Sequence, residues 1–206
     1  DVPGVEWIRL HYAYPTDFPM ELLDVMQRND NVCKYLDIAL QHVSTNVLKR
    51  MRRKINKEET INLLRTIRQE VPGIYLRTTL MVGFPGETDE EFEELVQFVK
   101  DMRFERMGAF AYSEEEGTYG AENFKDSISA KVKQERLDQL MTLQSGISLD
   151  FNQSRVGSQV KVVVDDFVDG VFVCRSEFES PEVDGEILVK YDSAQLGPVD
   201  PYSLVG

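Results

Sequence analysis

The alternation of strand-like and helix-like segments in the first half of the chain is the feature that most constrains its fold. Apolar runs of strand length occupy residues 5–14, 35–40, 74–82 and 104–112. Apolar residues at helical spacing occur in the segments 20–27, 43–51, 61–71 and 88–102. Strands separated by helices of this length are typical of parallel βαβ units. We therefore predict an α/β fold with four strands of a partial (β/α) barrel.

The pattern changes after residue 155. A long polar helix is expected over residues 130–153, and short β-rich runs follow at 159–164, 171–175 and 186–189. Asp-Gly pairs at 169–170 and 184–185 are typical of hairpin turns. We predict two domains: residues 1–154 hold the partial barrel and its last helix, and residues 155–206 form a small antiparallel β-barrel.

Charge limits the partners that the chain can bind. The 206 residues carry a net charge of −13. Residues 155–206 alone hold four basic and ten acidic residues, a net charge of −6. Such a surface repels a phosphate backbone and suits a cationic partner. No apolar run reaches the roughly 18 residues of a membrane helix, so no membrane partner is expected.

The two cysteines, Cys33 and Cys174, lie far apart in the sequence and form no C-x-x-C pair. This count excludes a disulfide framework and a four-thiolate metal site within the chain. We expect two free thiols in a reducing, cytoplasmic environment. The absence of an initial Met indicates an excised or processed fragment.

Polar residues alternate with apolar ones along three of the predicted strands. Because side chains in a strand point alternately to opposite faces, this spacing places one polar set on a common face. The set comprises Arg9, His11, Asp37, Gln41, Arg77 and Thr79. Two interpretations remain open: the face lines a ligand-binding barrel interior, or it is a structural Arg–Asp network, with Arg9 pairing Asp37.

Polar and glycine-rich segments follow two strands, at the end where barrel active sites lie. Gly83 and Gly86 flank a tight turn that lacks the lysine of a P-loop, and its backbone could approach a flat ligand. Gln41 and His42 could hydrogen-bond sugar hydroxyls, although a structural histidine is the simpler interpretation.

Two charged runs have similar alternatives. Six basic residues lie between Lys49 and Lys57, and three glutamates occupy positions 114–116. Either run could be a solvated surface. Otherwise the basic run contacts a phosphate or an acidic partner, and the glutamates contact a cationic substrate.

Four segments together resemble one family, the radical S-adenosylmethionine methylthiotransferases. The segments read YLDIALQHVS (35–44), VLKRMRR (47–53), LRTTLMVGFPGET (76–88) and GAFAYSEEEGT (108–118). The tail containing PEVDG (181–185) resembles the family's TRAM domain, a small β-barrel. The segment after Asp192 is shorter than in the family, which predicts an incomplete barrel.

The resemblance favours one branch of the family, whose members modify an aspartate of the twelfth small-subunit ribosomal protein. Arg77, Thr78 and Thr79 and the glutamates before Gly117 favour this branch. The tRNA-modifying branch is the alternative, and a non-catalytic protein-binding module is another. The acidic tail independently favours a basic protein over tRNA.

The resemblance also implies cofactors and site residues. The full-length enzyme would use S-adenosylmethionine and two [4Fe–4S] clusters, whose cysteine ligands this chain lacks, so it should be inactive alone. Arg77 is expected to pair with the cofactor's carboxylate. No catalytic residue or metal ligand is assigned. The remaining cofactor-binding candidates are Arg9, His11, Gln41, Ser44, Gly83, Phe84, Gly86, Tyr112 and Ser113.

Overall fold

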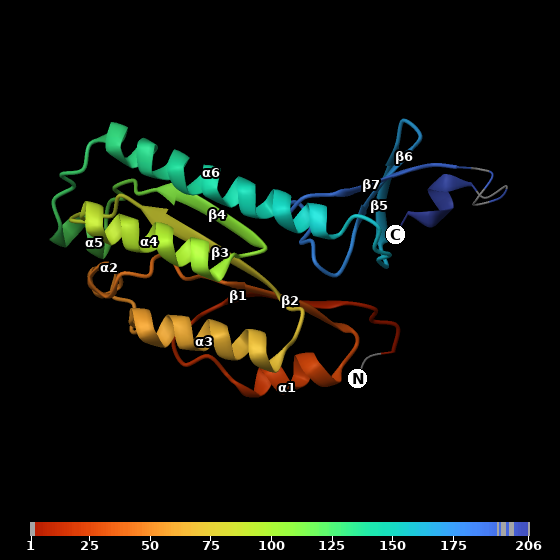
Figure 1. Cartoon of the computed structure of the whole chain (residues 1–206), viewed down its shortest axis with the longest axis horizontal. Helices are drawn as coiled ribbons and strands as arrows, with labels where there is room; N and C mark the ends of the chain where they lie inside the picture. The colour runs from red at the N-terminus through yellow and green to blue at the C-terminus, as the bar shows by residue number, and fades with distance from the viewer. Residues whose placement is uncertain (1–2, 193, 195–196, 198–199, 206) are drawn as a thin grey trace.

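A four-stranded parallel sheet organises the first part of the molecule, and the computed structural model describes residues 3–192, 194, 197 and 200–205. The strands follow one another in the order β1-β2-β3-β4. Figure 1 shows α6 running along the β4 edge, with α1 and α3 beside the opposite edge. The strands are β1 (Ile8–Ala13), β2 (Val32–Ile38), β3 (Tyr75–Val82) and β4 (Arg106–Ala111). The predicted α/β class is therefore confirmed.

Helices connect the strands and cover one face of the sheet. Two of them, α3 and α4, begin with capping boxes, in which Asn56 pairs with Glu59 and Thr88 pairs with Glu91. These reciprocal hydrogen bonds satisfy backbone N–H groups that a helix start leaves free. The helices are α1 (Glu21–Arg28), α2 (Thr45–Arg50), α3 (Lys57–Glu70), α4 (Asp89–Met102), α5 (Tyr119–Asn123) and α6 (Ala130–Ser154).

Alternation along β3 separates the core from the opposite face of the sheet. Leu76, Leu80 and Val82 are fully buried and belong to the main hydrophobic cluster, which also contains residues of α3, α4 and α6. Arg77 and Thr79 alternate with them and are only half-buried. The predicted period-two pattern is confirmed. The face that carries Arg77 is called the interior face below.

A second sheet follows α6. Its strands β5 (Val163–Val168), β6 (Val171–Arg175) and β7 (Ile187–Lys190) are antiparallel, and a short 3-10 helix, η1 (Pro201–Leu204), follows. Asp169 and Gly170 both have left-handed φ values, as a two-residue hairpin turn requires. This turn pairs Val168 with Val171. Hence β5 begins and ends four residues later than predicted, and it overlaps the predicted run 159–164 only at residues 163–164.

The second predicted Asp-Gly turn, at 184–185, is wrong. Residues 176–186 connect β6 to β7 as a longer loop, and the Asp184 carboxylate accepts a hydrogen bond from Tyr35 Oη at 2.7 Å. This long-range contact holds Asp184 against the first sheet. The expectation of an incomplete barrel concerns residues 193–206, of which 193, 195, 196, 198, 199 and 206 lie outside the described residues.

Cys33 in β2 and Cys174 in β6 are free and buried, as predicted. Burial raises the pKa of both thiols. Among the described residues, no helix combines the length and hydropathy needed to cross a membrane.

The capping glutamate Glu91 generates a test of stability. Its carboxylate accepts from Thr88 N–H at 3.0 Å and from Arg50 Nη2 at 2.8 Å. Burial opposes its ionisation, but these contacts outweigh burial and hold the pKa of Glu91 below 4.5. Glu91→Gln should lower the free energy of unfolding by about 2 kcal/mol at neutral pH. This difference should vanish as acidification passes through the lowered pKa, because the wild-type carboxylate then becomes neutral too.

The matched control is Glu59→Gln at the same capping position of α3. Glu59 is exposed and has no cationic partner within the described structure, so its replacement should cost clearly less. Denaturant titrations of both variants at several pH values measure the difference. Equal losses for the two variants would contradict the stabilising role of the Arg50 contact.

Candidate functional site

A cavity of about 540 Å³, called the upper cavity below, opens where β2, β3 and β4 reach their carboxyl ends. Residues from four different segments line it, and six of the thirteen have apolar or aromatic side chains. Ligand sites of parallel α/β sheets occur at this end of the strands. The lining residues are Gln41, Arg50, Met51, Arg53, Met81, Phe84, Phe110, Tyr112, Ser113, Glu115, Thr118, Tyr119 and Gly120.

Gln41 is fixed at the edge of this cavity by the backbone of β3. Its N–H donates to Thr79 O at 3.0 Å, and its carbonyl accepts from Met81 N–H at 2.7 Å. Its φ is +68°, which is rare for a residue with a side chain. Strained backbone that is held on both sides in this way is typical of binding sites.

Phe84 and Tyr112 form an aromatic wall of the cavity. Their rings meet edge to face, with centroids 5.2 Å apart. Tyr112 is 8% exposed, and its hydroxyl has no hydrogen-bond partner among the described residues. Burial, followed by the charges of Glu114, Asp126 and Glu115, raises the pKa of Tyr112. The phenol therefore stays neutral and can donate a hydrogen bond.

A buried polar cluster centred on Glu87 joins the loops that carry this wall to α6. Glu87 accepts from Gly83 N–H at 2.8 Å and from Arg136 Nη1 at 2.7 Å. Its other neighbour is His42, whose Nε2 lies 3.5 Å from Glu87 Oε2. Ser44 N–H donates to His42 Nδ1, so the ring proton lies on Nε2, facing the carboxylate. Glu87 thus ties both strand-end loops to α6.

Arg53 is a cationic group in the cavity that has no carboxylate partner within the described structure. Its Nη2 donates to the carbonyl of Ala39, and its guanidinium lies 4.5 Å from the centroid of the Tyr14 ring. Its Nε is buried without a hydrogen-bond partner. Burial lowers the pKa of Arg53, although the group remains charged. A half-buried cation that lacks a carboxylate partner is stabilised when an anion binds beside it.

The structure divides the residues predicted for the site into three groups. Gln41, Phe84, Tyr112 and Ser113 lie together around the cavity. Ser44, Gly83 and Gly86 lie just outside its lining. Ser44 caps α2 and donates to Glu91, Gly83 packs against Lys133, and Gly86 lies near Arg50.

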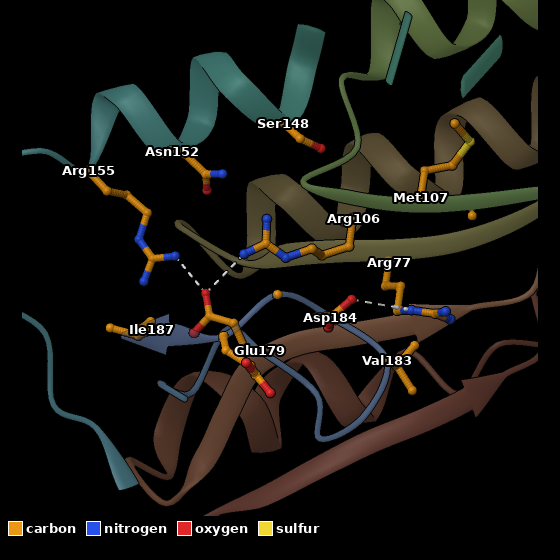
Figure 2. A pocket seen from close by; sticks show the side chains of 13 residues that line it. Arg77, Arg106, Met107, Ser148, Asn152, Arg155, Glu179, Val183, Asp184 and Ile187 are labelled. Carbon is orange, nitrogen blue, oxygen red and sulfur yellow. Dashed lines mark hydrogen bonds and ion pairs between the residues drawn. The ribbon is translucent and has the colours of Figure 1, made fainter. Parts of the chain in front are cut away.

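The third group, Arg9, His11 and Arg77, lies nearer the amino ends of the strands. Arg77 donates to Asp37 at 3.1 Å and lines a separate cleft of about 440 Å³ between the two sheets. Figure 2 shows the contact between Arg77 and Asp184 in this cleft. The Arg–Asp network foreseen as an alternative exists here, with Arg77 in place of Arg9 as the partner of Asp37.

Only some residues of the basic run 49–57 and of the glutamate run 114–116 line the cavity. Arg50 and Arg53 of the basic run line the cavity, whereas Lys57 pairs with Glu94 at 2.7 Å. Among the three glutamates, Glu115 lines the cavity and accepts from Ser113 Oγ at 2.8 Å. Sequence reasoning missed Arg53 as a site residue. The position of the basic run in the sequence could have indicated it. The run lies one short helix after the end of a strand, close to the edge of the sheet where ligand sites occur.

Family models match both parts of the chain. Residues 4–99 match the radical SAM superfamily, and residues 156–200 match the TRAM domain. The first match covers β1, β2 and β3 of the parallel sheet and ends before β4, and the second match covers β5, β6 and β7. The predicted fold class, a radical SAM type sheet followed by a TRAM-like β-structure, is confirmed.

Curated relatives match nearly the whole chain. "Ribosomal protein uS12 methylthiotransferase RimO" of Parabacteroides distasonis is 60% identical over 203 residues, which cover 98% of this chain and 46% of the relative. The protein of the same name from Bacteroides thetaiotaomicron is 58% identical over 95% of this chain and 45% of the relative. The chain resembles RimO, as predicted, and spans about 46% of the length of such relatives.

Solved structures show a similar fold at low identity. Coproporphyrinogen III oxidase (HemN) from Escherichia coli, described as a radical SAM enzyme, aligns with a TM-score of 0.57 and 15% identity. The alignment covers 83% of this chain and 46% of HemN. The archaeal Elp3 of Methanocaldococcus infernus aligns with a TM-score of 0.50 and 14% identity, over 82% of this chain and 52% of Elp3.

Gly83 provides a test of how tightly the turn is packed. A Cβ at this position would lie 2.4 Å from Lys133 Cγ, and the φ of +72° also disfavours a side chain. Gly73 has a similar φ of +81° with nothing within 4 Å of a Cβ. Gly73→Ala should cost about 1 kcal/mol from its backbone alone. Gly83→Ala should cost about 1–3 kcal/mol more, because Lys133 must move.

Thermal and denaturant unfolding of the two variants measure this difference. Lys133 Nζ donates to the carbonyl of Tyr112, so Gly83→Ala should also alter the fluorescence or ring NMR signals of the cavity wall. If both alanine variants lose the same stability, the Lys133 contact does not restrict the turn.

Proposed function

We propose, on the premise that this chain resembles RimO over nearly its whole length, that it is the C-terminal part of a radical SAM methylthiotransferase. The reaction adds a methylthio group to an aspartate of ribosomal protein uS12, in the cytoplasm. We divide the chain at about residue 155 into a cofactor-binding barrel part and a TRAM domain. The identity of 58–60% to proteins named for this activity supports the assignment.

One observation in the fold carries the proposal. The upper cavity combines the half-buried guanidinium of Arg53, which has no carboxylate partner among the described residues, with aromatic and thioether side chains. S-adenosylmethionine presents a carboxylate, ribose hydroxyls and a flat base in one molecule. A cavity that has a guanidinium without a carboxylate partner and an aromatic wall is complementary to such a ligand.

Arg53 is our candidate for the residue that binds the carboxylate of the cofactor. Its surroundings fit this role better than those of Arg77 do. The two arginines differ in their surroundings. Arg77 already contacts Asp37 at 3.1 Å and Asp184 at 3.6 Å. Arg53 has no carboxylate partner within the described residues and lines the same cavity as Gln41. An arginine that lacks a counter-ion gains more from a bound carboxylate than one already paired.

The other cavity residues divide between polar and flat contacts. Gln41 offers an amide that can donate to and accept from ribose hydroxyls. Phe84 and Tyr112 offer the flat wall for the base, and Ser113 offers a hydroxyl at the rim. Ser44, Gly83 and Gly86 hold the two loops that carry these groups. Arg9 and His11 do not line the cavity. Their contacts with the loop 176–185 and with Asp37 hold β1 in place.

The radical chemistry needs more than this chain. S-adenosylmethionine and an iron–sulfur cluster together supply hydrogen abstraction from an unreactive carbon. The described residues contain no group of His, Cys, Asp or Glu side chains arranged to hold a metal. We therefore assign the ligands of the two proposed [4Fe–4S] clusters to the part of the relatives that this chain does not span. The chain's own residues bind and orient the cofactor.

The role of Arg53 can be tested in the full-length enzyme. Arg53→Ala should weaken S-adenosylmethionine binding by about 10- to 100-fold, because a desolvated charge-assisted pair is lost. Lys49 belongs to the same basic run, is exposed and is not among the lining residues, so Lys49→Ala serves as the matched control. Isothermal titration with S-adenosylmethionine measures both. A large loss for Arg77→Ala with none for Arg53→Ala would return the role to Arg77.

The substrate can be tested separately with the reconstituted full-length enzyme. Incubation with uS12 and with tRNA, followed by mass spectrometry, reports which molecule gains a methylthio group. We expect the aspartate of uS12 to be modified, since the chain carries a net charge of −13 and the ribosomal partner is basic. Modification of tRNA would assign the chain to the other branch. Binding of uS12 without modification would favour a non-catalytic module.

A further inference from the structure

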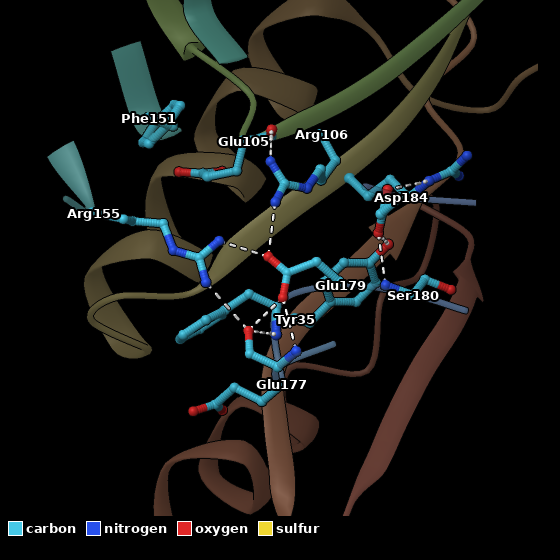
Figure 3. Close-up of polar contacts among 12 residues, drawn as sticks. Tyr35, Glu105, Arg106, Phe151, Arg155, Glu177, Glu179, Ser180 and Asp184 are labelled. Carbon is cyan, nitrogen blue, oxygen red and sulfur yellow. Dashed lines mark hydrogen bonds and ion pairs between the residues drawn. The ribbon is translucent and has the colours of Figure 1, made fainter. Parts of the chain in front are cut away.

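The loop between β6 and β7 contacts every strand of the parallel sheet. Residues 176–185, called the inserted loop below, lie against the interior face near the amino ends of the strands (Figure 3). Arg9 of β1 donates to the carbonyls of Ser176 and Glu177, both at 3.1 Å. On β3, the ring of Tyr75 stacks on Phe178 of the loop, with centroids 4.2 Å apart.

Glu179 anchors one end of this loop. Its carboxylate accepts from Arg106 of β4 at 2.9 Å and from Arg155, just after α6, at 2.6 Å. It also accepts from Ser176 N–H at 2.9 Å and is 2% exposed. Figure 3 shows both guanidinium groups converging on this carboxylate. Two cations of the barrel part therefore share one buried counter-ion from the second sheet.

Asp184 lies at the other end of the loop and joins two strands. Its Oδ2 accepts from Tyr35 of β2 at 2.7 Å, while its Oδ1 lies 3.6 Å from Arg77 Nε of β3. The Asp184 side chain is 4% exposed, and Tyr35 is fully buried. Arg77 in turn pairs with Asp37, which lies 3.8 Å from His11 Nδ1.

The β2–β3 pairing is short where Asp184 joins it. Three residue pairs define its register, including Tyr35 with Tyr75 and Asp37 with Arg77. By contrast, β3 and β4 pair over six residues. Asp184 contacts one residue of each strand and therefore bridges β2 and β3 at this short ladder.

We propose that Asp184 is a positioning residue, which links β2 to β3 from the second sheet and thereby fixes the strand ends that form the upper cavity. Gln41 follows Asp37 in the continuation of β2, and its backbone bonds span Thr79 and Met81 of β3. The cavity geometry thus depends on the β2–β3 register. No residue of the inserted loop lines the upper cavity. Its effect there acts through the strands.

Hydrogen–deuterium exchange of the full-length enzyme tests the bridge without any ligand. Asp184→Ala should speed exchange at the β2–β3 ladder, residues 35–38 and 75–78, by about tenfold, the loss expected for one buried hydrogen-bonded link. Exchange at the longer β3–β4 ladder, residues 108–111, should stay within about twofold. The control is Glu182→Ala, an exposed residue of the same loop, which should change neither.

Tyr35→Phe gives a second variant that removes a single hydroxyl and keeps the ring. It should reproduce part of the effect alone and add nothing in the Asp184→Ala background, because both changes break the same contact. If Asp184→Ala and Tyr35→Phe speed exchange only in β5, β6 and β7, the bridge does not position the barrel strands, and the proposal is wrong.

The functional readout rests on the proposed function, since it uses S-adenosylmethionine. We expect Asp184→Ala to weaken cofactor binding by several-fold, and Glu182→Ala to leave it unchanged. If Asp184→Ala speeds β2–β3 exchange but leaves the cofactor affinity unchanged, Asp184 bridges the two strands without positioning the upper cavity, and that part of the proposal is wrong. If the wild-type enzyme fails to bind S-adenosylmethionine, the proposed function fails, while the exchange results still decide the bridge.

Discussion

Neutralisation of the arginines on the interior face is the constraint on which the rest of this structure depends. Parallel sheets are usually apolar on both faces, but here each of β1, β3 and β4 carries an arginine inward. Removing such charges from water is costly unless each finds a partner. The partners of Arg9, Arg77 and Arg106 include groups of the inserted loop. The two sheets therefore form one structure through charge pairing as well as apolar contact.

The need to neutralise half-buried arginines is met differently at the two ends of the same strands. Near the amino ends, each of these arginines meets a carboxylate or a carbonyl of the inserted loop. At the carboxyl ends, Arg53 lines the upper cavity and lacks a counter-ion among the described residues. Catalytic and binding groups of α/β proteins gather at this second end, where loops can vary without disturbing the sheet. The amino ends of the strands thus carry the contacts that join the two sheets, and we propose that the carboxyl ends bind the ligand.

Local patterns made much of this predictable from the sequence. Period-two alternation placed Arg9 and Arg77 on one face, and the helical spacing of apolar residues over 88–102 indicated α4, because both patterns depend on neighbouring residues alone. The long-range partners were not predictable in this way. Asp184 looks like a hairpin residue in the sequence, yet in the fold it contacts Tyr35, which lies in the other sheet. Arg53 was hidden in a basic run, because burial and lack of a counter-ion are properties of the fold.

The central claim is that the upper cavity holds S-adenosylmethionine with its carboxylate on Arg53. A crystal structure of the full-length, cluster-reconstituted enzyme with S-adenosylmethionine tests this claim most directly. The account predicts the cofactor's carboxylate within hydrogen-bonding distance of the Arg53 guanidinium, with the base beside Phe84 and Tyr112. A cofactor carboxylate bound to Arg77, or a cofactor outside this cavity, would contradict it.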